Sequence, residues 1–88
     1  MADGMGDGEK RHVYVLKSDA DKRPYIGVTS NVARRLDTHN SGGSVWTAPF
    51  RPWRLAVSIE FPTEDRALQF ERYLKSGSGR AFARRHFL

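Results

Sequence analysis

The 88-residue sequence contains no cysteine. Disulfide bonds and thiolate metal sites are therefore excluded. No apolar run approaches the roughly 20 residues that a membrane-spanning helix needs, and no signal peptide is visible at the N-terminus. We therefore expect a soluble, cytoplasmic protein.

Several common catalytic patterns are also missing. No Ser/His/Asp set and no paired-carboxylate site is apparent, and the three histidines do not fall in a zinc-ligand spacing. The stretch Gly77-Ser78-Gly79-Arg80 is rich in glycine, but it lacks the spacing and the lysine of a P-loop. The sequence thus gives no support for a serine hydrolase, a zinc enzyme or a P-loop nucleotide-binding protein.

Acidic residues are fewer than basic ones, 10 against 15, and the net charge is +5. The first ten residues hold three acids and one lysine, so the remaining residues carry +7. Arginine outnumbers lysine 11 to 4, and its planar guanidinium group suits phosphate. A compact basic domain is typical of a polyanion binder, although a basic surface can also serve solubility alone.

The length predicts one domain with a small core. Residues 1–10 are acidic and Gly-rich without apolar periodicity, so we expect a disordered tail followed by a single domain at 11–88. The interior pattern predicts three strands and three helices, in the order β-β-α-β-α-α. The strands are expected at His12–Leu16, Tyr25–Val28 and Arg54–Phe61, and the helices at Asn31–Asn40, from Thr63 to about Lys75, and at Arg80–Phe87.

This order predicts an α+β fold in which helices pack on a sheet. The loop 19–24 is short, so the first two strands should form an antiparallel hairpin. Residues 44–52 are expected to be irregular. The stretch Ser76–Gly79 is expected to break the chain between the last two helices.

Two tyrosines stand on the predicted hairpin. Tyr14 alternates with Val13 and Val15, and Tyr14 and Tyr25 are expected on one face. Gly27 has no side chain on that face, which predicts a bulge or a place where a ligand approaches the backbone. The alternative is a pair of ordinary cross-strand aromatic residues.

A polar stripe follows on the next helix. Asn31, Arg35 and His39 are spaced four apart and therefore share a helix face, beside the apolar stripe of Val32 and Leu36. An arginine and a histidine next to a strand end suit an anionic ligand. The alternative is a solvated helix face.

Glu71 lies at the margin of an apolar helix face, near Leu68 and Leu74. A carboxylate there is costly to desolvate unless it is paired or bound to metal. One alternative is an i, i+4 ion pair with Lys75. The other is a single carboxylate ligand for Mg²⁺, which keeps several waters and uses few protein ligands.

Further residues are candidates for nucleic-acid binding. Exposed cations would contact the phosphate backbone, and an aromatic side chain in the irregular loop would stack on an unpaired base, unless it closes the core instead. The candidates are Arg34, Lys75, Arg80, Arg84, Arg85 and Trp46. We place Trp53 in the core.

Taken together, Val13-Tyr14, Tyr25-Ile26-Gly27, Arg35, His39 and Glu71 occur in the order and spacing of a GIY-YIG nuclease domain. Residues 11–82 resemble that family, and most closely its small stand-alone bacterial members that resemble the N-terminal domain of the excinuclease C subunit. The middle of the chain is also similar to the catalytic subunit of the eukaryotic branched-DNA endonuclease. One departure is His12, which replaces the first glycine of the signature and is expected to be an exposed strand residue.

The resemblance implies a three-stranded antiparallel sheet and hydrolysis of a phosphodiester bond with one divalent ion, Mg²⁺ or Mn²⁺. It implies that Tyr14 is the general base or orients the attacking water. Tyr25 and Arg35 would hold the scissile phosphate, His39 would relay a proton or contact the phosphate, and Glu71 would bind the metal. A phenol has a pKa near 10, so Arg35 and the metal would have to lower the pKa of Tyr14.

The functional hypothesis is a metal-dependent DNA endonuclease that selects single-stranded, nicked or branched DNA in repair or processing. The alternative is a nucleic-acid-binding module with weak or no cleavage. In either case a partner subunit could supply targeting.

Overall fold

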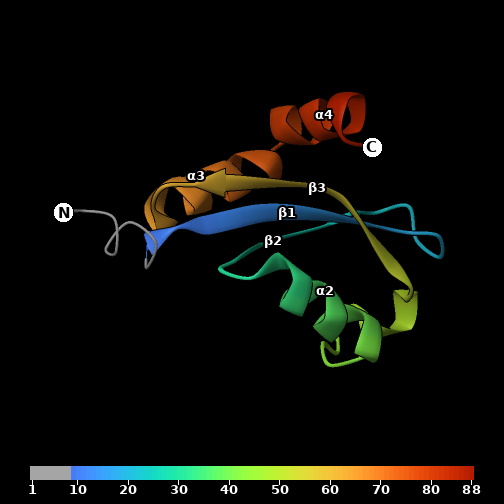
Figure 1. Cartoon of the computed structure of the whole chain (residues 1–88). Coiled ribbons are helices and arrows are strands. Elements are labelled where there is room, and N and C mark those ends of the chain that lie inside the picture. Colours follow the sequence, from blue (N-terminus) through green and yellow to red (C-terminus); the bar gives the residue numbers. More distant parts are fainter. Residues whose placement is uncertain (1–8) are drawn as a thin grey trace.

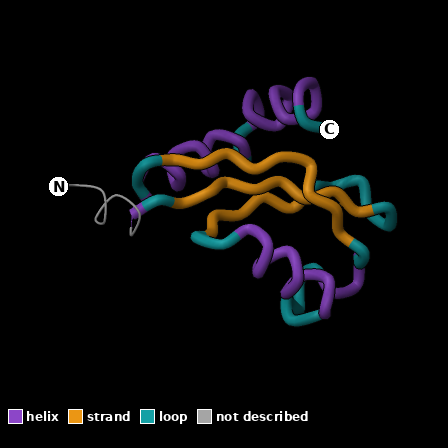
Figure 2. The backbone as a smooth tube through the Cα atoms, viewed as in Figure 1, coloured by secondary structure: helices purple, strands orange, loops and turns teal. Residues whose placement is uncertain are grey.

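The computed structural model describes residues 9–88, and the first eight residues of the predicted tail lie outside that range. The elements are β1 (Arg11–Ser18), β2 (Tyr25–Thr29), α2 (Val32–Ser41), a 3₁₀ helix (Ala48–Phe50), β3 (Trp53–Phe61), α3 (Glu64–Leu74) and α4 (Gly77–His86). The sheet order is β2-β1-β3, with both pairs antiparallel. Figures 1 and 2 show helices on both sides of this sheet. The predicted α+β fold and the order β-β-α-β-α-α are therefore confirmed.

The central strand β1 supplies both cores of the domain. Val13 and Val15 belong to one hydrophobic cluster, and Tyr14 and Leu16 belong to another. All four are at most 1% exposed. Successive strand residues point to opposite faces, so one buried strand divides the molecule into two packed layers.

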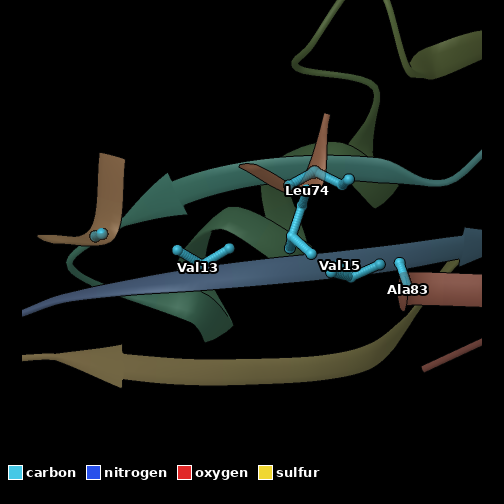
Figure 3. Packing of buried hydrophobic residues seen from close by; sticks show 6 residues of the cluster. Val13, Val15, Leu74 and Ala83 are labelled. Carbon is cyan, nitrogen blue, oxygen red and sulfur yellow. The ribbon is translucent and has the colours of Figure 1, made fainter. Parts of the chain in front are cut away.

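Helices α3 and α4 cover the face that carries Val13 and Val15. Helix α3 packs against β1, β2 and α4, and its Leu74 meets the two valines together with Ala83 of α4 (Figure 3). Leu74 is completely buried; burying a leucine stabilises a fold by roughly 1.5–3 kcal/mol. This layer is an ordinary apolar core.

Helix α2 lies on the other face of the sheet (Figure 1). The Asn31 side chain caps it by accepting a hydrogen bond from the Arg34 N–H at 3.0 Å, as a residue before a helix often does. The helix ends at Gly42, whose φ of 87° is the left-handed conformation that glycine adopts without strain. The helix itself spans Val32–Ser41, with Gly42 as its C-terminal cap, so it begins and ends one residue later than predicted.

The predicted break between the last two helices is present, but it is shorter than predicted and lies at Lys75 and Ser76. Helix α4 begins at Gly77 instead of Arg80, because Ser76 caps it by accepting a hydrogen bond from the Gly79 N–H at 3.2 Å. Gly79 is buried against the end of α3, and a Cβ there would lie 1.7 Å from the Tyr73 carbonyl oxygen. The glycine permits close packing of α4 on α3 and does not end a helix.

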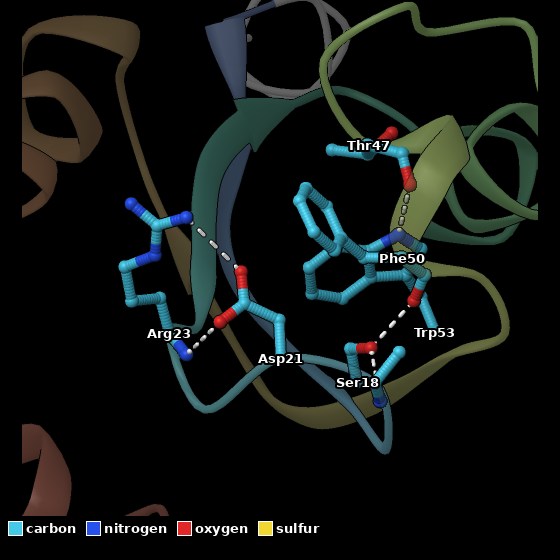
Figure 4. Close-up of polar contacts among 7 residues, drawn as sticks. Ser18, Asp21, Arg23, Thr47, Phe50 and Trp53 are labelled. Carbon is cyan, nitrogen blue, oxygen red and sulfur yellow. Dashed lines mark hydrogen bonds and ion pairs between the residues drawn. The ribbon is translucent and has the colours of Figure 1, made fainter.

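The loop between α2 and β3 is irregular, as predicted, apart from the 3₁₀ helix, and hydrogen bonds hold it in place. The Asn40 amide accepts from the Trp53 N–H at 2.6 Å and donates to the Trp53 carbonyl at 3.0 Å. The Trp53 indole donates to the Thr47 carbonyl at 2.9 Å, and the Ser18 hydroxyl donates to the Phe50 carbonyl at 2.5 Å (Figure 4). Trp53 is 5% exposed, which confirms its place in the core.

Within residues 9–88, none of the helices combines the length and the apolar character that crossing a membrane requires.

Candidate active site

Three aromatic rings meet between the β1–β2 hairpin and α2. The Tyr14 and Tyr25 ring centroids are 6.1 Å apart, and the Tyr25 and His39 centroids are 4.6 Å apart. The register explains the meeting, because Leu16 pairs with Tyr25 and Tyr14 pairs with Gly27 across the two strands. The prediction that the two tyrosines share a face is confirmed.

His39 is fixed at both ring nitrogens. Its Nε2 lies 3.1 Å from the Tyr14 hydroxyl, and its Nδ1 lies 2.7 Å from the Thr47 hydroxyl. The Thr47 hydroxyl donates its single proton to the Ser44 carbonyl at 3.4 Å. With that donation, Thr47 accepts from Nδ1–H, and Nε2 is then the acceptor for the Tyr14 hydroxyl.

Burial sets the protonation of this pair. The pKa of His39 is lowered, first by burial and second by the positive charge of Arg35, so the imidazole is neutral at neutral pH. The pKa of Tyr14 is raised by burial, although hydrogen bonding to Arg35 and its charge oppose that effect. Arg35 alone therefore does not give Tyr14 the low pKa that a base at neutral pH needs.

The site has an inner and an outer layer. Tyr14 is 1% exposed and His39 is 0% exposed, whereas Tyr25 and Arg35 are partly exposed. The predicted polar stripe is therefore not a solvated helix face, because α2 turns His39 into the protein. Tyr25 and Arg35 are the members of the cluster that a ligand can reach.

Gly27 makes room for Tyr14. A Cβ at Gly27 would lie 2.6 Å from the Tyr14 hydroxyl oxygen. The predicted bulge is not at this position, because β1 and β2 pair without interruption, and the irregularity falls between Val15 and Leu16 opposite β3. The free space above Gly27 is occupied by the phenol, so it offers no approach for a ligand.

Glu71 is not part of the ring cluster. It lies on α3, whose buried Ala67 and Leu74 pack in the core on the opposite face of the sheet. Its carboxylate pairs with Lys75 at 3.1 Å, and its side chain is 21% exposed. The expected i, i+4 pair is thus present, and the metal role stays a prediction.

The described residues offer few protein ligands for a divalent ion. Across residues 9–88, no three His, Cys, Asp or Glu side chains gather as a metal cluster. Glu71 would therefore act as a lone carboxylate, with water and substrate phosphate completing the ligands, and Mg²⁺ accepts such a set. Glu71 fits that role because it is accessible and its lysine partner has a flexible side chain.

The predicted nucleic-acid contacts do not form one cluster. All the predicted cations are exposed, and Trp46 is 83% exposed. Lys75, Arg80 and Arg84 line one cavity, whereas Arg85 lies in a separate hollow on α4. Arg34 is on α2, on the other side of the sheet.

Two other positions differ from the sequence prediction or were absent from it. His12 is partly buried and lies 3.6 Å from Glu60, so it is not a freely exposed strand residue. Thr47 was missed altogether. Its separation from His39 by an irregular loop gave no periodic signal, and only the folded loop places its hydroxyl on the imidazole.

A scan against family models matches residues 10–85 to the GIY-YIG catalytic domain. The chain belongs to the GIY-YIG family. The match to the family covers nearly all of the described residues, so it includes both tyrosines, α2 and α3.

Individual relatives within the GIY-YIG family agree with this assignment. The chain is 45% identical over 64 residues to the structure-specific endonuclease subunit slx1 of Schizosaccharomyces japonicus, covering 66% of this chain and 23% of that protein. It is 37% identical over 65 residues to a UPF0213 protein of Bacillus licheniformis, covering 73% and 67%. The chain thus spans about a quarter of the first relative and two thirds of the second.

One similar protein of known structure has the same fold. The solution structure of a UPF0213 protein from Bacillus halodurans superposes with a TM-score of 0.51 at 32% identity, covering 83% of this chain and 80% of the other. Together, the family model and the endonuclease relative support a nuclease.

Proposed function

We propose that the chain is a metal-dependent DNA endonuclease that hydrolyses a phosphodiester bond. The observation that carries the proposal is the hydrogen-bonded chain Tyr14–His39–Thr47, buried beneath Tyr25 and Arg35 in a GIY-YIG domain. Buried polar groups are costly unless every partner is matched, and both ring nitrogens of His39 have a partner here.

The accessible outer layer contacts the substrate, and the buried inner layer acts behind it. Tyr25 and Arg35 are the accessible groups, so they contact the scissile phosphate, and Arg35 neutralises the charge that develops on it. Tyr25 is also the phenol that meets the attacking water, because Tyr14 is buried. Tyr14 acts behind it, where its hydroxyl group interacts with both Arg35 and Tyr25.

A proton can pass inward without a free phenolate. The attacking water would give its proton to the Tyr25 oxygen, the Tyr25 hydroxyl proton would pass to the Tyr14 oxygen, and the Tyr14 proton would pass to Nε2 of His39, 3.1 Å away. Thr47 accepts from Nδ1–H before and after the transfer and so keeps the imidazole oriented. The raised pKa of Tyr14 disfavours a standing phenolate, and this relay avoids one.

The divalent ion, Mg²⁺ or Mn²⁺, would be held by Glu71 together with water and phosphate oxygens. When bound, such an ion lowers the pKa of a coordinated water and stabilises negative charge on the phosphate. Glu71 would exchange its ion pair with Lys75 for the metal.

The substrate proposal rests on the surface and on the relatives. Trp46 presents an exposed indole one residue from Thr47, where it can stack on an unpaired base. The similar endonuclease subunit is named as structure-specific. We propose DNA with single-stranded, nicked or branched regions, in cytoplasmic repair or processing, with a partner subunit as an open possibility.

One observation favours a second candidate function. Tyr14 and His39 are both shielded from solvent, and that burial is also what a purely structural polar pair would show. The second candidate is therefore a nucleic-acid-binding module with little or no cleavage.

The test is cleavage of labelled single-stranded, duplex, flap and four-way DNA with Mg²⁺, Mn²⁺ or EDTA. We expect metal-dependent cutting by the wild-type protein and a loss of roughly a hundredfold or more in Glu71→Gln. The matched control is Glu64→Gln, because Glu64 lies on the same helix but pairs with Arg11 at 3.8 Å.

Binding of DNA should persist in Glu71→Gln. Equal activity in the Glu71→Gln and Glu64→Gln proteins would remove the metal role from Glu71. Binding without cutting in any metal, by folded wild-type protein, would favour the binding module.

A further inference from the structure

A cavity lies on the side of β2 opposite the tyrosine cluster. Its volume is about 710 Å³, and its walls come from residues 22–26, the end of α3, and α4. Figure 1 shows α4 beside the end of α3, above the sheet and away from α2. The volume falls within the roughly 300–1,000 Å³ of small-molecule sites.

The charged side chains of the lining are all basic. The cations are Lys22, Arg23, Lys75, Arg80 and Arg84, and no acidic side chain is among the lining residues. Two are neutralised from outside the cavity, Arg23 by Asp21 at 3.2 Å and Lys75 by Glu71 at 3.1 Å. Within residues 9–88, the other three make no ion pair.

The rest of the lining is apolar. It consists of Pro24, Ile26, Leu74, Ala83 and Leu88, together with Tyr25. A ligand for this cavity therefore needs a flat or apolar part for the floor and negative charge for the rim. A nucleotide unit has both, a base with a π-face and a phosphate.

The cavity adjoins both halves of the proposed catalytic site. Tyr25 lines it, while the Tyr25 ring also contacts Tyr14 and His39. Lys75 lines it and holds Glu71. A strand that crosses β2, which is an edge strand, would pass from the outer tyrosine into the cavity.

We propose that this cavity binds one unpaired nucleotide of the substrate strand next to the scissile phosphate. Its base would rest on Pro24 and Leu88, the exposed apolar members of the lining, and its phosphate would be held by Arg80 and Arg84. The proposal rests on the proposed nuclease function and specifies the substrate, because a base within a stacked duplex cannot enter a cavity without unpairing. It places selection for single-stranded or branched DNA in this cavity.

Two neighbouring arginines provide a matched pair of variants. Arg84 lines the cavity, whereas Arg85, next to it on α4, lies in the separate hollow with Phe82 and His86. Arg84→Ala and Arg85→Ala remove the same charge from exposed positions of one helix. General electrostatic attraction would weaken in both variants alike.

The experiment measures binding of a short oligothymidylate and of thymidine 5′-monophosphate in EDTA, by NMR titration. We expect shifts at Ile26, Leu74 and Arg80, and binding about tenfold to a hundredfold weaker in Arg84→Ala. Arg85→Ala, outside the cavity, should show only the small loss of affinity that removing one surface charge causes. A blunt duplex of the same sequence should leave the cavity residues unshifted.

Equal weakening in Arg84→Ala and Arg85→Ala, or no shifts at the cavity with any probe, would overturn the proposal. The nuclease proposal is tested separately, by the DNA cleavage assay. A protein that cuts DNA while its cavity binds no probe would retain the nuclease proposal and lose this one. If the cavity binds the probes but the protein cuts no DNA, the nuclease proposal is lost and nucleotide binding in the cavity is retained.

Discussion

At the scale of single residues, His39 decides how the inner layer behaves. It is completely buried, its Nδ1–H is held by Thr47, and its Nε2 faces the Tyr14 hydroxyl. These contacts are satisfied by the neutral tautomer in which Nδ1–H donates to Thr47 and the Nε2 lone pair faces the Tyr14 hydroxyl. The same atoms with the opposite tautomer could not accept a proton from Tyr14.

Replacing Thr47 tests that assignment. Thr47→Val keeps the shape but removes the acceptor for Nδ1–H, which leaves a buried donor unsatisfied and should destabilise the fold by about 1–3 kcal/mol. The imidazole ¹⁵N spectrum should also change from the Nδ1–H tautomer. The control is Thr38→Val, whose hydroxyl donates to the Arg34 carbonyl at 3.0 Å on the exposed side of α2. An unchanged His39 tautomer in Thr47→Val would contradict the assignment.

The pH dependence of stability follows from His39. Its pKa is lowered from 6.5 in the folded state, so the unfolded chain binds more protons as the pH falls below that value. Its contribution is therefore complete above about pH 6.5 and is lost as the pH falls toward the folded pKa, with a slope of at most about 1.4 kcal/mol per pH unit.

Urea unfolding between pH 7.5 and 5 checks this expectation. The wild-type free energy of unfolding should decrease across that window, and His39→Gln should show a shallower decrease. His86→Gln, at an exposed position, should follow the wild type. Parallel profiles for wild type and His39→Gln would show that His39 does not carry the dependence.

Residue-scale contacts were the least predictable from sequence. The spacing of Arg35 and His39 placed them on one helix face, but whether that face is solvated depends on the sheet it packs against. Thr47 reaches His39 only through a folded loop. The function of Gly27 depends on its register opposite Tyr14, which a pattern along one strand does not contain.

At the scale of elements, the contact between α3 and α4 depends on one glycine. Gly79 lies so close to Tyr73 that any side chain would collide with its backbone carbonyl. Gly77, two residues earlier in the same helix, has open space around it, and a Cβ there would meet nothing within 4 Å. The two glycines therefore share a sequence motif but not a structural role.

Alanine at each position separates these roles. Gly79→Ala should destabilise the protein by more than about 3 kcal/mol, because backbone must move to admit the methyl group. Gly77→Ala should be neutral or should stabilise by up to about 1 kcal/mol, since alanine loses less entropy in a helix. Thermal unfolding measures both, and similar melting temperatures for the two variants would contradict this packing.

Element types were predictable because periodicity reports them directly. β-Branched and aromatic residues located the first strand, a short hairpin loop the second and alternation the third, and residues that can cap helices, Ser30 or Asn31 and Thr63, located two helix starts. The structure has Asn31 and Thr63 as the caps. The start of α4 was missed because Ser-Gly-Ser-Gly reads as a loop. Ser76 is a local capping signal that the glycines obscured, whereas the close packing of Gly79 on Tyr73 arises only in the folded protein.

At the scale of the whole molecule, the edge strand β2 lies between the two proposed sites. The tyrosine cluster is on the α2 side, and the basic cavity is on the side of α3 and α4. The excess of arginine predicted a polyanion partner, but not its separation into a cavity and scattered surface cations. That separation arises from which helix covers which face, and composition carries no such information.

The most direct measurement of the central claim compares two tyrosine variants in metal-dependent cleavage of branched DNA. Tyr25→Phe removes the accessible phenol of the ring cluster, and Tyr73→Phe removes one on α3 that is 40% exposed and lies in the ring contacts of the other layer. We predict wild-type cutting that EDTA abolishes, a loss of roughly a hundredfold or more in Tyr25→Phe, and near wild-type cutting in Tyr73→Phe. Equal activity in the two variants, or cutting that persists in EDTA, would contradict the account.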